Sequence, residues 1–225
     1  MKRLLLLAIP LLLTASPASS QNLGVALRAG TTGLGVQAGY GLHSRINLRI
    51  NYSAFALSQT RIEKGDPDLE IQADAGVGAI SGFVDVHPFA TSFRLTVGLG
   101  QNALDVDAVA TPLEGVCLGD QSDNGPCDGK EFSAERVGKL TGKVSYASGM
   151  HPYIGMGFGN LGTGQGLITF LFDLGAYFTG SPSIEMDGQG LIRPTAESDN
   201  VQVLNDGIES FTWYPVVSLG IGIRL

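Results

Sequence analysis

The side chains that could do chemistry in this chain do not gather into one catalytic set. His43 and Ser44 are neighbours, but a nucleophilic site also needs an acid to orient the histidine. Gly157–Gly162 matches G-x-G-x-x-G, yet a further predicted strand follows it where a dinucleotide site requires a helix. A short acidic run lacks the spacing and closing glutamate of an EF-hand loop and consists of Asp120, Asp123, Asn124 and Asp128. We therefore expect no catalytic, cofactor-binding or metal-binding residues and no enzyme.

The two cysteines, Cys117 and Cys127, predict a disulfide. The nine residues between them are polar and turn-rich, as in an exposed loop. No histidine or further cysteine stands nearby to complete a metal or catalytic site. A bridge over so short a loop would contribute roughly 2–3 kcal/mol in the chain-entropy model.

Isolated charges form a second group of candidates. They alternate with apolar residues in segments that otherwise carry small side chains, and the main ones are Arg49, Arg94, Asp173 and Arg224. Arg28, Lys139 and Lys143 are spaced in the same way. Arginines and aspartates that face one enclosed space would pair there, so the elements that hold them decide their role.

The segments that hold these charges are predicted to be β-strands, because apolar residues recur in them at every second position. In 45–52, Ile46, Leu48 and Ile50 share one parity and Arg49 lies on the other. Side chains of alternating parity point to opposite faces of a sheet. The same alternation occurs in 34–42, 93–100, 138–146, 151–159, 166–178 and 211–225.

The second face of these strands favours a membrane barrel over a soluble sandwich or barrel. It carries glycine and single charges, where a water-exposed sheet would carry a dense polar coat. Small residues suit the crowded interior of a narrow barrel, and closure leaves no strand edge unpaired in lipid. The sequence predicts an all-β fold, an antiparallel up-and-down transmembrane β-barrel whose lumen the charges fill.

The connections fit short turns at one end and long loops at the other. Residues 42–45, 87–92 and 147–151 are expected as turns, and 58–68 and 108–137 as long outer loops. The motif His-Pro-aromatic recurs at two of the turns. Its aromatic residues, Phe89 and Tyr153, are expected in an interfacial girdle.

Two strand counts remain open. If 23–42 is one strand the total is eight, but the turns then place both termini outside. Splitting it at Thr31–Gly33 and adding 182–190 gives ten strands and periplasmic termini. We prefer eight, with ten as the alternative. Residues 195–210 show helical spacing and form either a short amphipathic helix or an acidic loop.

The first twenty residues have the features of a secretory signal peptide. Lys2 and Arg3 precede an apolar run over 4–13, and small residues follow up to Ser20. We expect cleavage before Gln21, which leaves one barrel domain over 21–225. The chain has 32 glycines, 16% charged residues and a net charge of −7, so nothing indicates a nucleic-acid partner.

The chain resembles the small bacterial outer-membrane barrels of the opacity-type and OmpA-like group. The segments that carry the resemblance are Gly39–Arg49, Phe172–Gly175 with Gly180–Pro182, and Tyr214–Leu225. It implies a Gram-negative outer membrane, contact with its lipid and lipopolysaccharide, and insertion machinery that reads the C-terminal strand. Such strands usually end in an aromatic residue, whereas this one ends in Leu225.

Barrel architecture does not by itself name an activity. The function expected from the sequence is non-enzymatic: a structural or surface-interaction role through the outer loops, with no external partner identified. A small-solute channel and a lipid-modifying barrel enzyme are the alternatives, and a soluble secreted β-barrel is a more distant one.

Overall fold

The computed structural model describes residues 22–65, 67–89, 91–118, 129–163 and 166–225. The strands are β1 Leu23–Gly30, β2 Gly33–His43, β3 Ile46–Glu63, β4 Leu69–Val86, β5 Phe93–Pro112, β6 Val116–Leu118, β7 Lys130–Phe132, β8 Leu140–Ser145, β9 His151–Phe158, β10 Ile168–Phe178, β11 Ser183–Gly188 and β12 Trp213–Arg224. The helices are α1 Ala134–Val137, the 3-10 helix η2 Gly190–Ala196 and α2 Ser198–Ile208.

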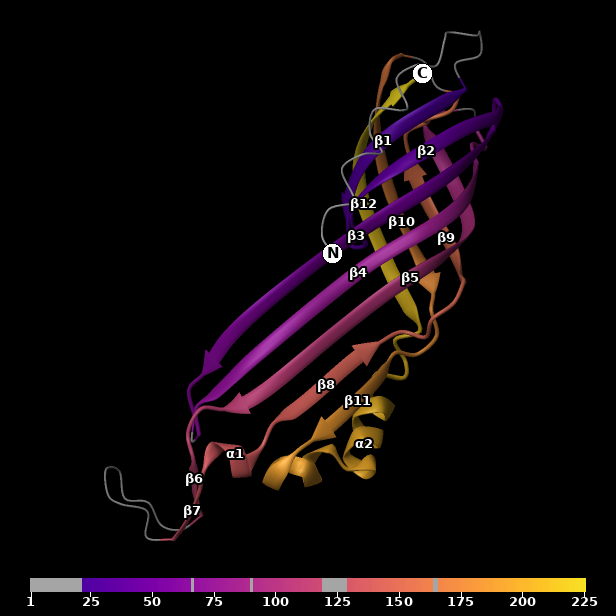
Figure 1. The fold of residues 1–225 in the computed structure, drawn as a ribbon. Coiled ribbons are helices and arrows are strands. Elements are labelled where there is room, and N and C mark those ends of the chain that lie inside the picture. Colours follow the sequence, from indigo (N-terminus) through magenta and orange to yellow (C-terminus); the bar gives the residue numbers. More distant parts are fainter. Residues whose placement is uncertain (1–21, 66, 90, 119–128, 164–165) are drawn as a thin grey trace.

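Eight of these strands close into an antiparallel barrel (Figure 1). The ring runs β1, β2, β3, β4, β5, β9, β10, β12 and back to β1, where Gly24 pairs with Arg224. Closure satisfies the backbone of every strand in the ring, as a bilayer requires. The predicted all-β antiparallel barrel of eight strands is confirmed.

The count of eight arises differently from the prediction. The run 23–42 does split, with a tight turn at Thr31 and Thr32 between β1 and β2. The predicted turn at 147–151 is wrong, because β8 and β9 both run antiparallel to β5 and the chain does not reverse between them. One strand gained and one lost leave eight crossings, and both ends of the barrel chain lie at the same end.

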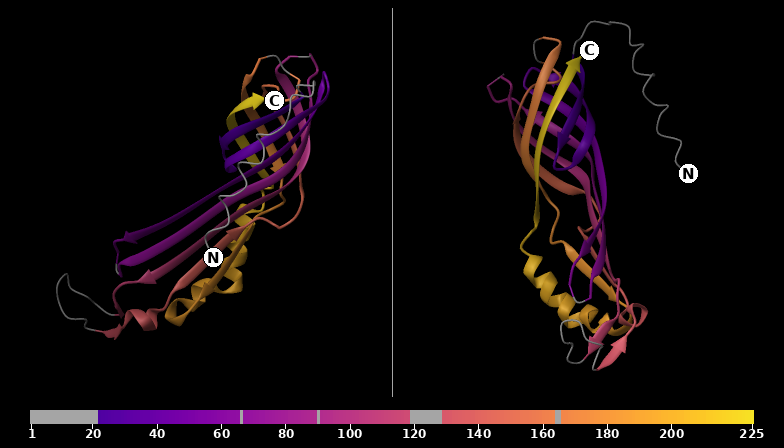
Figure 2. Two further views of the ribbon diagram at one scale, coloured as in Figure 1. Left: turned by 45° about the horizontal axis from the view of Figure 1, so that its top comes forward. Right: turned by 90° about the vertical axis from the view of Figure 1, so that its left-hand side faces the viewer.

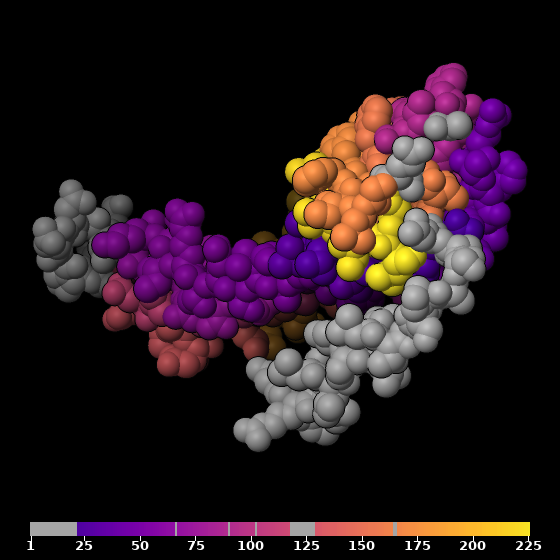
Figure 3. Space-filling model, turned by 90° about the horizontal axis from the view of Figure 1, so that it is seen from above, coloured from indigo at the N-terminus to yellow at the C-terminus, as the bar shows by residue number. Residues whose placement is uncertain are grey.

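Five strand paths continue beyond the barrel as an outer sheet (Figures 1 and 2). β3, β4 and β5 have 18, 18 and 20 residues, about twice what a bilayer crossing needs. β8 and β11 join them in the order β11-β8-β5-β4-β3. Seen from above, this sheet slants away to one side of the barrel (Figure 3). We call the barrel end from which it leaves the rim, and the opposite end the turn end.

Two segments expected as loops are therefore partly strand. The β3–β4 ladder continues to the pair Glu63 and Leu69, so only 64–68 connects them, and β5 extends to Pro112. The connection placed at 108–137 begins after Pro112 and contains β6, β7 and α1. The polar composition of the two segments expected as loops reflects a sheet with one solvated face.

The outside of the barrel is an apolar belt. On β12 the exposed large apolar residues are Trp213, Val217, Leu219, Ile221 and Ile223, and the buried ones of the other parity include Tyr214, Ser218 and Arg224. Aromatic pairs border the belt. The ring centroids of Phe178 and Trp213 are 5.2 Å apart near the rim, and those of Phe93 and Phe158 are 5.4 Å apart at the turn end. Such a belt with two aromatic girdles is typical of transmembrane barrels.

The apolar parity changes sides at the rim. Along β3, Ile50 and Tyr52 point outward, whereas Phe55 and Leu57 have the parity of the barrel interior. β4 and β5 make the same change, from Ile80 to Val77 and from Leu99 to Leu104. Below the rim apolar side chains face outward. Above it most of them face the side of the outer sheet that continues the barrel interior, which we call its concave side, the other being its convex side. This is the arrangement expected where strands leave lipid for water.

Helix α2 lies along the free edge of β11. The Asn205 side chain accepts a hydrogen bond from Ile184 N at 2.7 Å and donates one to Ile184 O at 2.9 Å. It thereby takes the place of a further strand at this edge. The helical alternative for 195–210 is the one observed. Within the described part of the chain, no helix is both long and apolar enough to span a bilayer.

Candidate functional site

A charged network fills the middle of the barrel, and Asp173 lies at its centre. The Asp173 carboxylate contacts Arg28 at 3.0 Å, Arg49 at 3.2 Å and Arg94 at 2.7 Å. These side chains come from β10, β1, β3 and β5, and each is at most 7% exposed. Arg49, Arg94 and Asp173 are thus brought together as a group.

A second carboxylate, Asp85 on β4, completes the network. It accepts hydrogen bonds from Arg49 at 2.8 Å and from the Thr96 hydroxyl at 2.7 Å. The Gln37 carbonyl oxygen on β2 accepts from both Arg28 at 2.6 Å and Arg49 at 3.0 Å. Arg28 also donates to Ser218 on β12. Seven of the eight barrel strands contribute a side chain.

The eighth strand, β9, contributes space. A Cβ atom on Gly157 would clash with the Phe172 carbonyl oxygen and lie 3.1 Å from the Arg94 guanidinium carbon, so glycine at this position leaves room for the Arg94 side chain. Arg94 in turn donates to two carbonyl oxygens, those of Gly159 and Phe172. With three arginines against two aspartates, these carbonyls help stabilise the additional positive charge.

An aromatic layer lies between this network and the rim. Phe83, Tyr153, Tyr177 and Tyr214 are at most 9% exposed and form one cluster with Val216. The Tyr153 ring centroid is 4.8 Å from that of Phe83 and 4.9 Å from that of Tyr177. The Arg49 guanidinium lies 5.1 Å from the Phe83 ring centroid, which joins the two layers.

Two predicted placements need comment here. Tyr153 does not lie in an interfacial girdle but inside the barrel, because the interruption at 146–150 has one residue more than 101–104 of β5 opposite it. One additional residue reverses the faces of the strand that follows. Arg224 lies apart from the central network, at the turn end, where it donates to the Asn160 carbonyl at 2.8 Å.

The turn end is closed by the connection between β9 and β10. Leu161 is 2% exposed and packs inside the barrel against Ala26 and Leu171. The Asn160 side chain accepts a hydrogen bond from Asn47 at 2.9 Å. The G-x-G-x-x-G match spans the end of β9 and the start of this connection, so it belongs to the strand and to the cover of the barrel end.

Sequence reasoning missed Asp85, Gln37 and the interior aromatic residues. Asp85 stands between Val84 and Val86, which are exposed on the belt, so the parity of 80–86 could have placed it inside. Tyr177 and Tyr214 alternate with belt residues in the same way. An aromatic residue on the small-residue face is the signal that marks a lumen-filling layer.

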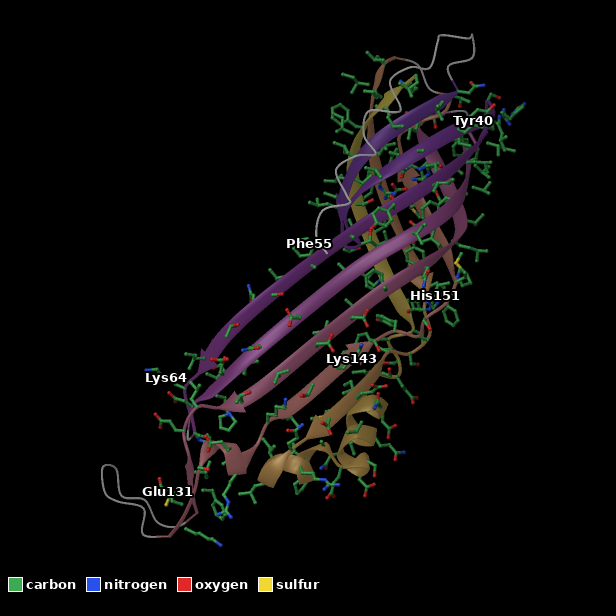
Figure 4. The ribbon with its side chains drawn as sticks, viewed as in Figure 1. Tyr40, Phe55, Lys64, Glu131, Lys143 and His151 are labelled. Carbon is green, nitrogen blue, oxygen red and sulfur yellow. The ribbon has the colours of Figure 1, made fainter. Side chains whose placement is uncertain are left out.

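The outer sheet presents an acidic face on its convex side. One row of directly paired residues crosses all five strands: Ser58, Asp74, Asp107, Lys143 and Glu185. Lys143 lies 3.7 Å from Asp105, and both are about half exposed. Like charges directly opposite each other, as in Asp74 and Asp107, destabilise a sheet unless solvent screens them. Figure 4 shows Lys143 on this sheet and Lys64 at its far tip.

The cysteine and acidic-loop predictions fall largely outside the described residues. Cys117 lies on β6, which pairs with β7 through Glu131 opposite Cys117. Cys127 and the run from Asp120 to Asp128 are not among the described residues. The predicted disulfide between Cys117 and Cys127 therefore stays a prediction.

Comparison with known proteins places this architecture. The crystal structure of Acinetobacter baumannii CarO is similar over 90% of this chain and 97% of that chain, with a TM-score of 0.58 and 20% identity. CarO2 of the same organism is similar over 90% and 98%, with a TM-score of 0.56 and 17% identity. These likenesses show a shared β-barrel fold. No family model and no curated protein matches the chain, and the opacity-type subgroup stays a resemblance.

Proposed function

We propose that this chain is a non-enzymatic, non-conducting outer-membrane barrel that holds a rigid β-sheet outside a Gram-negative cell for contact with its surroundings. The observation that carries the proposal is the contrast between a filled interior and an extended exterior. The network around Asp173 and the layer around Tyr177 occupy the barrel, whereas five strand paths continue beyond it.

The filled interior argues against a channel. An ion that crosses must pass both layers, and Arg94, Tyr177 and Asp173 are each at most 2% exposed. Displacing them breaks buried charge-assisted bonds and leaves buried charges uncompensated, which is costly. The lumen residues that the structure describes also bond to one another, and none of them pairs a nucleophile with a base as a lipid-modifying enzyme would need.

The exterior argues for a membrane-anchored surface role. The belt residues on β12 and their aromatic borders are suited to lipid contact, and the change of apolar parity at the rim supports a boundary with water there. We propose that outer-membrane lipid and lipopolysaccharide surround the belt. β12, which ends at Arg224 beside Leu225, would be the strand that the insertion machinery recognises.

Planar-bilayer recording tests the proposal. The purified chain should give no steady single-channel current, in parallel with an open porin as positive control. The double variant Arg94→Ala/Asp173→Ala removes both partners of one ion pair. It leaves Arg49 with Asp85, and Arg28 with Gln37 and Ser218, so it should fold and show raised ion flux. A stable, large current from the unmodified chain would overturn the proposal in favour of a small-solute channel.

A further inference from the structure

The outer part of β3 is a free strand edge. Pairing with β2 ends at Leu34 opposite Ala54, whereas pairing with β4 continues to Glu63 opposite Leu69. From Phe55 to Glu63 the sheet pairings of the described residues thus lie on one side only. Every second residue of such a strand directs its N–H and C=O away from the sheet.

The opposite edge of the same sheet is protected. There Asn205 binds both backbone groups of Ile184, and η2 and α2 lie beside β11. Natural sheets usually protect an edge in this way, or with lysine, proline or a bulge. The β3 edge has none of these from Phe55 to Thr60: this stretch contains no charged residue and no proline, and its ladder with β4 is regular.

The side chains along this edge specify the occupant. Phe55 and Leu57 are 48% and 46% exposed on the concave face, and Ser58 and Thr60 lie on the other face. The only charges, Arg61 and Glu63, pair with each other at 2.9 Å near the tip. Figure 4 shows Phe55 just beyond the barrel and Lys64 at the end of the hairpin. An added strand would therefore need apolar residues beside Phe55 and Leu57.

A second copy in the same membrane does not fit. Two such copies are related by an axis normal to the membrane, and barrel strands tilt by roughly 35–45° from that axis. Their β3 edges would cross at roughly 70–90°, too far from antiparallel to form a ladder.

We propose that the β3 edge from Phe55 to Glu63 binds an extended segment of another protein by β-augmentation. The segment adds a sixth strand to the outer sheet, and its alternate apolar residues pack beside Phe55 and Leu57. Basic residues on its other face are favoured by the acidic convex side, which includes Asp74 and Asp107. This inference rests on the proposed function, since it needs the sheet to lie outside the cell.

The test uses a synthetic nine-residue peptide. Its sequence copies Leu69–Val77, which already pairs in register with Phe55–Glu63, with lysine in place of Glu70 and Asp74. Two further versions are N-methylated on one or the other set of alternate residues. Binding of each to the full chain in lipid nanodiscs is measured by fluorescence anisotropy. One methylated set should weaken binding about tenfold or more and the other should leave it unchanged, since only one set faces β3.

Matched variants locate the site. Leu57→Lys places a charge on the free edge and should weaken binding about tenfold. Ala75→Lys places the same charge on the residue directly opposite, inside the sheet, and should leave binding nearly unchanged. Hydrogen exchange should show protection confined to 55–63. Absence of binding by all three peptides, equal loss for both methylated sets, or equal loss for both lysine variants would each overturn the inference. Bilayer recording would not change in those cases, so the proposed function is tested separately.

Discussion

Asp173 is the residue on which the interior depends most. It is the one carboxylate that the described residues place in contact with Arg28, Arg49 and Arg94 together. A buried ion pair contributes little net stability against an apolar replacement, but removal of one partner leaves a charge uncompensated. Here one change would leave three arginines facing a single remaining carboxylate, Asp85.

We expect Asp173→Asn to destabilise the folded barrel by about 3–5 kcal/mol. The measurement is the temperature at which the heat-modifiable band on a gel converts to the unfolded one. Asp187→Asn, a similar change on an exposed residue of β11, is the control and should leave that temperature unchanged. Equal effects of the two substitutions would show that the interior network does not stabilise the barrel.

The sequence indicated which charges face inward but not which of them meet. Parity alone placed Arg49, Arg94 and Asp173 on the interior face, and the structure has all three there. Their height in the barrel depends on strand register, which places Asp173 opposite both Gly157 and Ser218 and leaves Arg224 at the turn end. Register is set by contacts between distant strands, so local periodicity does not contain it.

At the scale of elements, the rim is encoded by a change of parity. The apolar side of β3, β4 and β5 reverses near Ala54, Gly78 and Gln101 without a break in the ladder between them. The alternation in 138–146 belongs to the outer sheet, so its apolar residues face the concave side. Alternation alone predicts a strand but does not say which face meets lipid.

Arginine substitutions on either side of the rim should separate lipid from water. Ile221→Arg lies in the belt and should cost on the order of 2–4 kcal/mol of insertion free energy. Ile62→Arg replaces an isoleucine of the outer sheet that is 55% exposed, against 50% for Ile221. This variant should insert as the parent does. Folding into lipid vesicles measures both. If Ile221→Arg inserted as well as the parent, the belt would be misassigned.

The hydrogen bonds of the Asn205 side chain should hold α2 against the β11 edge. Asn205→Ala removes its bonds to Ile184 and its bond to the Val201 carbonyl at 3.0 Å. We expect hydrogen exchange at the Ile184 amide to become about tenfold faster or more, since lost bonds of about 1 kcal/mol each favour local opening. Heat-modifiability should not change.

The control for this substitution is Asn200→Ala on the same helix. Asn200 donates to the Pro194 carbonyl at 3.0 Å and has no bond to β11. If it accelerated exchange at Ile184 as much as Asn205→Ala, the effect would come from helix stability rather than from the edge contact.

For the whole molecule, the arrangement of the two ends predicts a topology. Ser58 lies on the outer sheet and Ser44 in the turn between β2 and β3, at the opposite end. In a background of Cys117→Ser and Cys127→Ser, Ser58→Cys should react with a membrane-impermeant maleimide on intact cells. Ser44→Cys should react only after the outer membrane is permeabilised. The reverse pattern would place the outer sheet in the periplasm.

The seam between β1 and β12 indicates the order in which the strands pair during folding. It joins Gly24 to Arg224, the two ends of the barrel chain. The long β3–β4 ladder, by contrast, forms between neighbours in sequence that a short connection joins. Contacts between distant residues are slow to form, so the seam closes late. Arg28 on β1 reaches Asp173 and Ser218 only across that seam. The buried network is therefore completed only after the seam has closed. Removing the Asp173 carboxylate should speed unfolding and leave the rate of insertion almost unchanged.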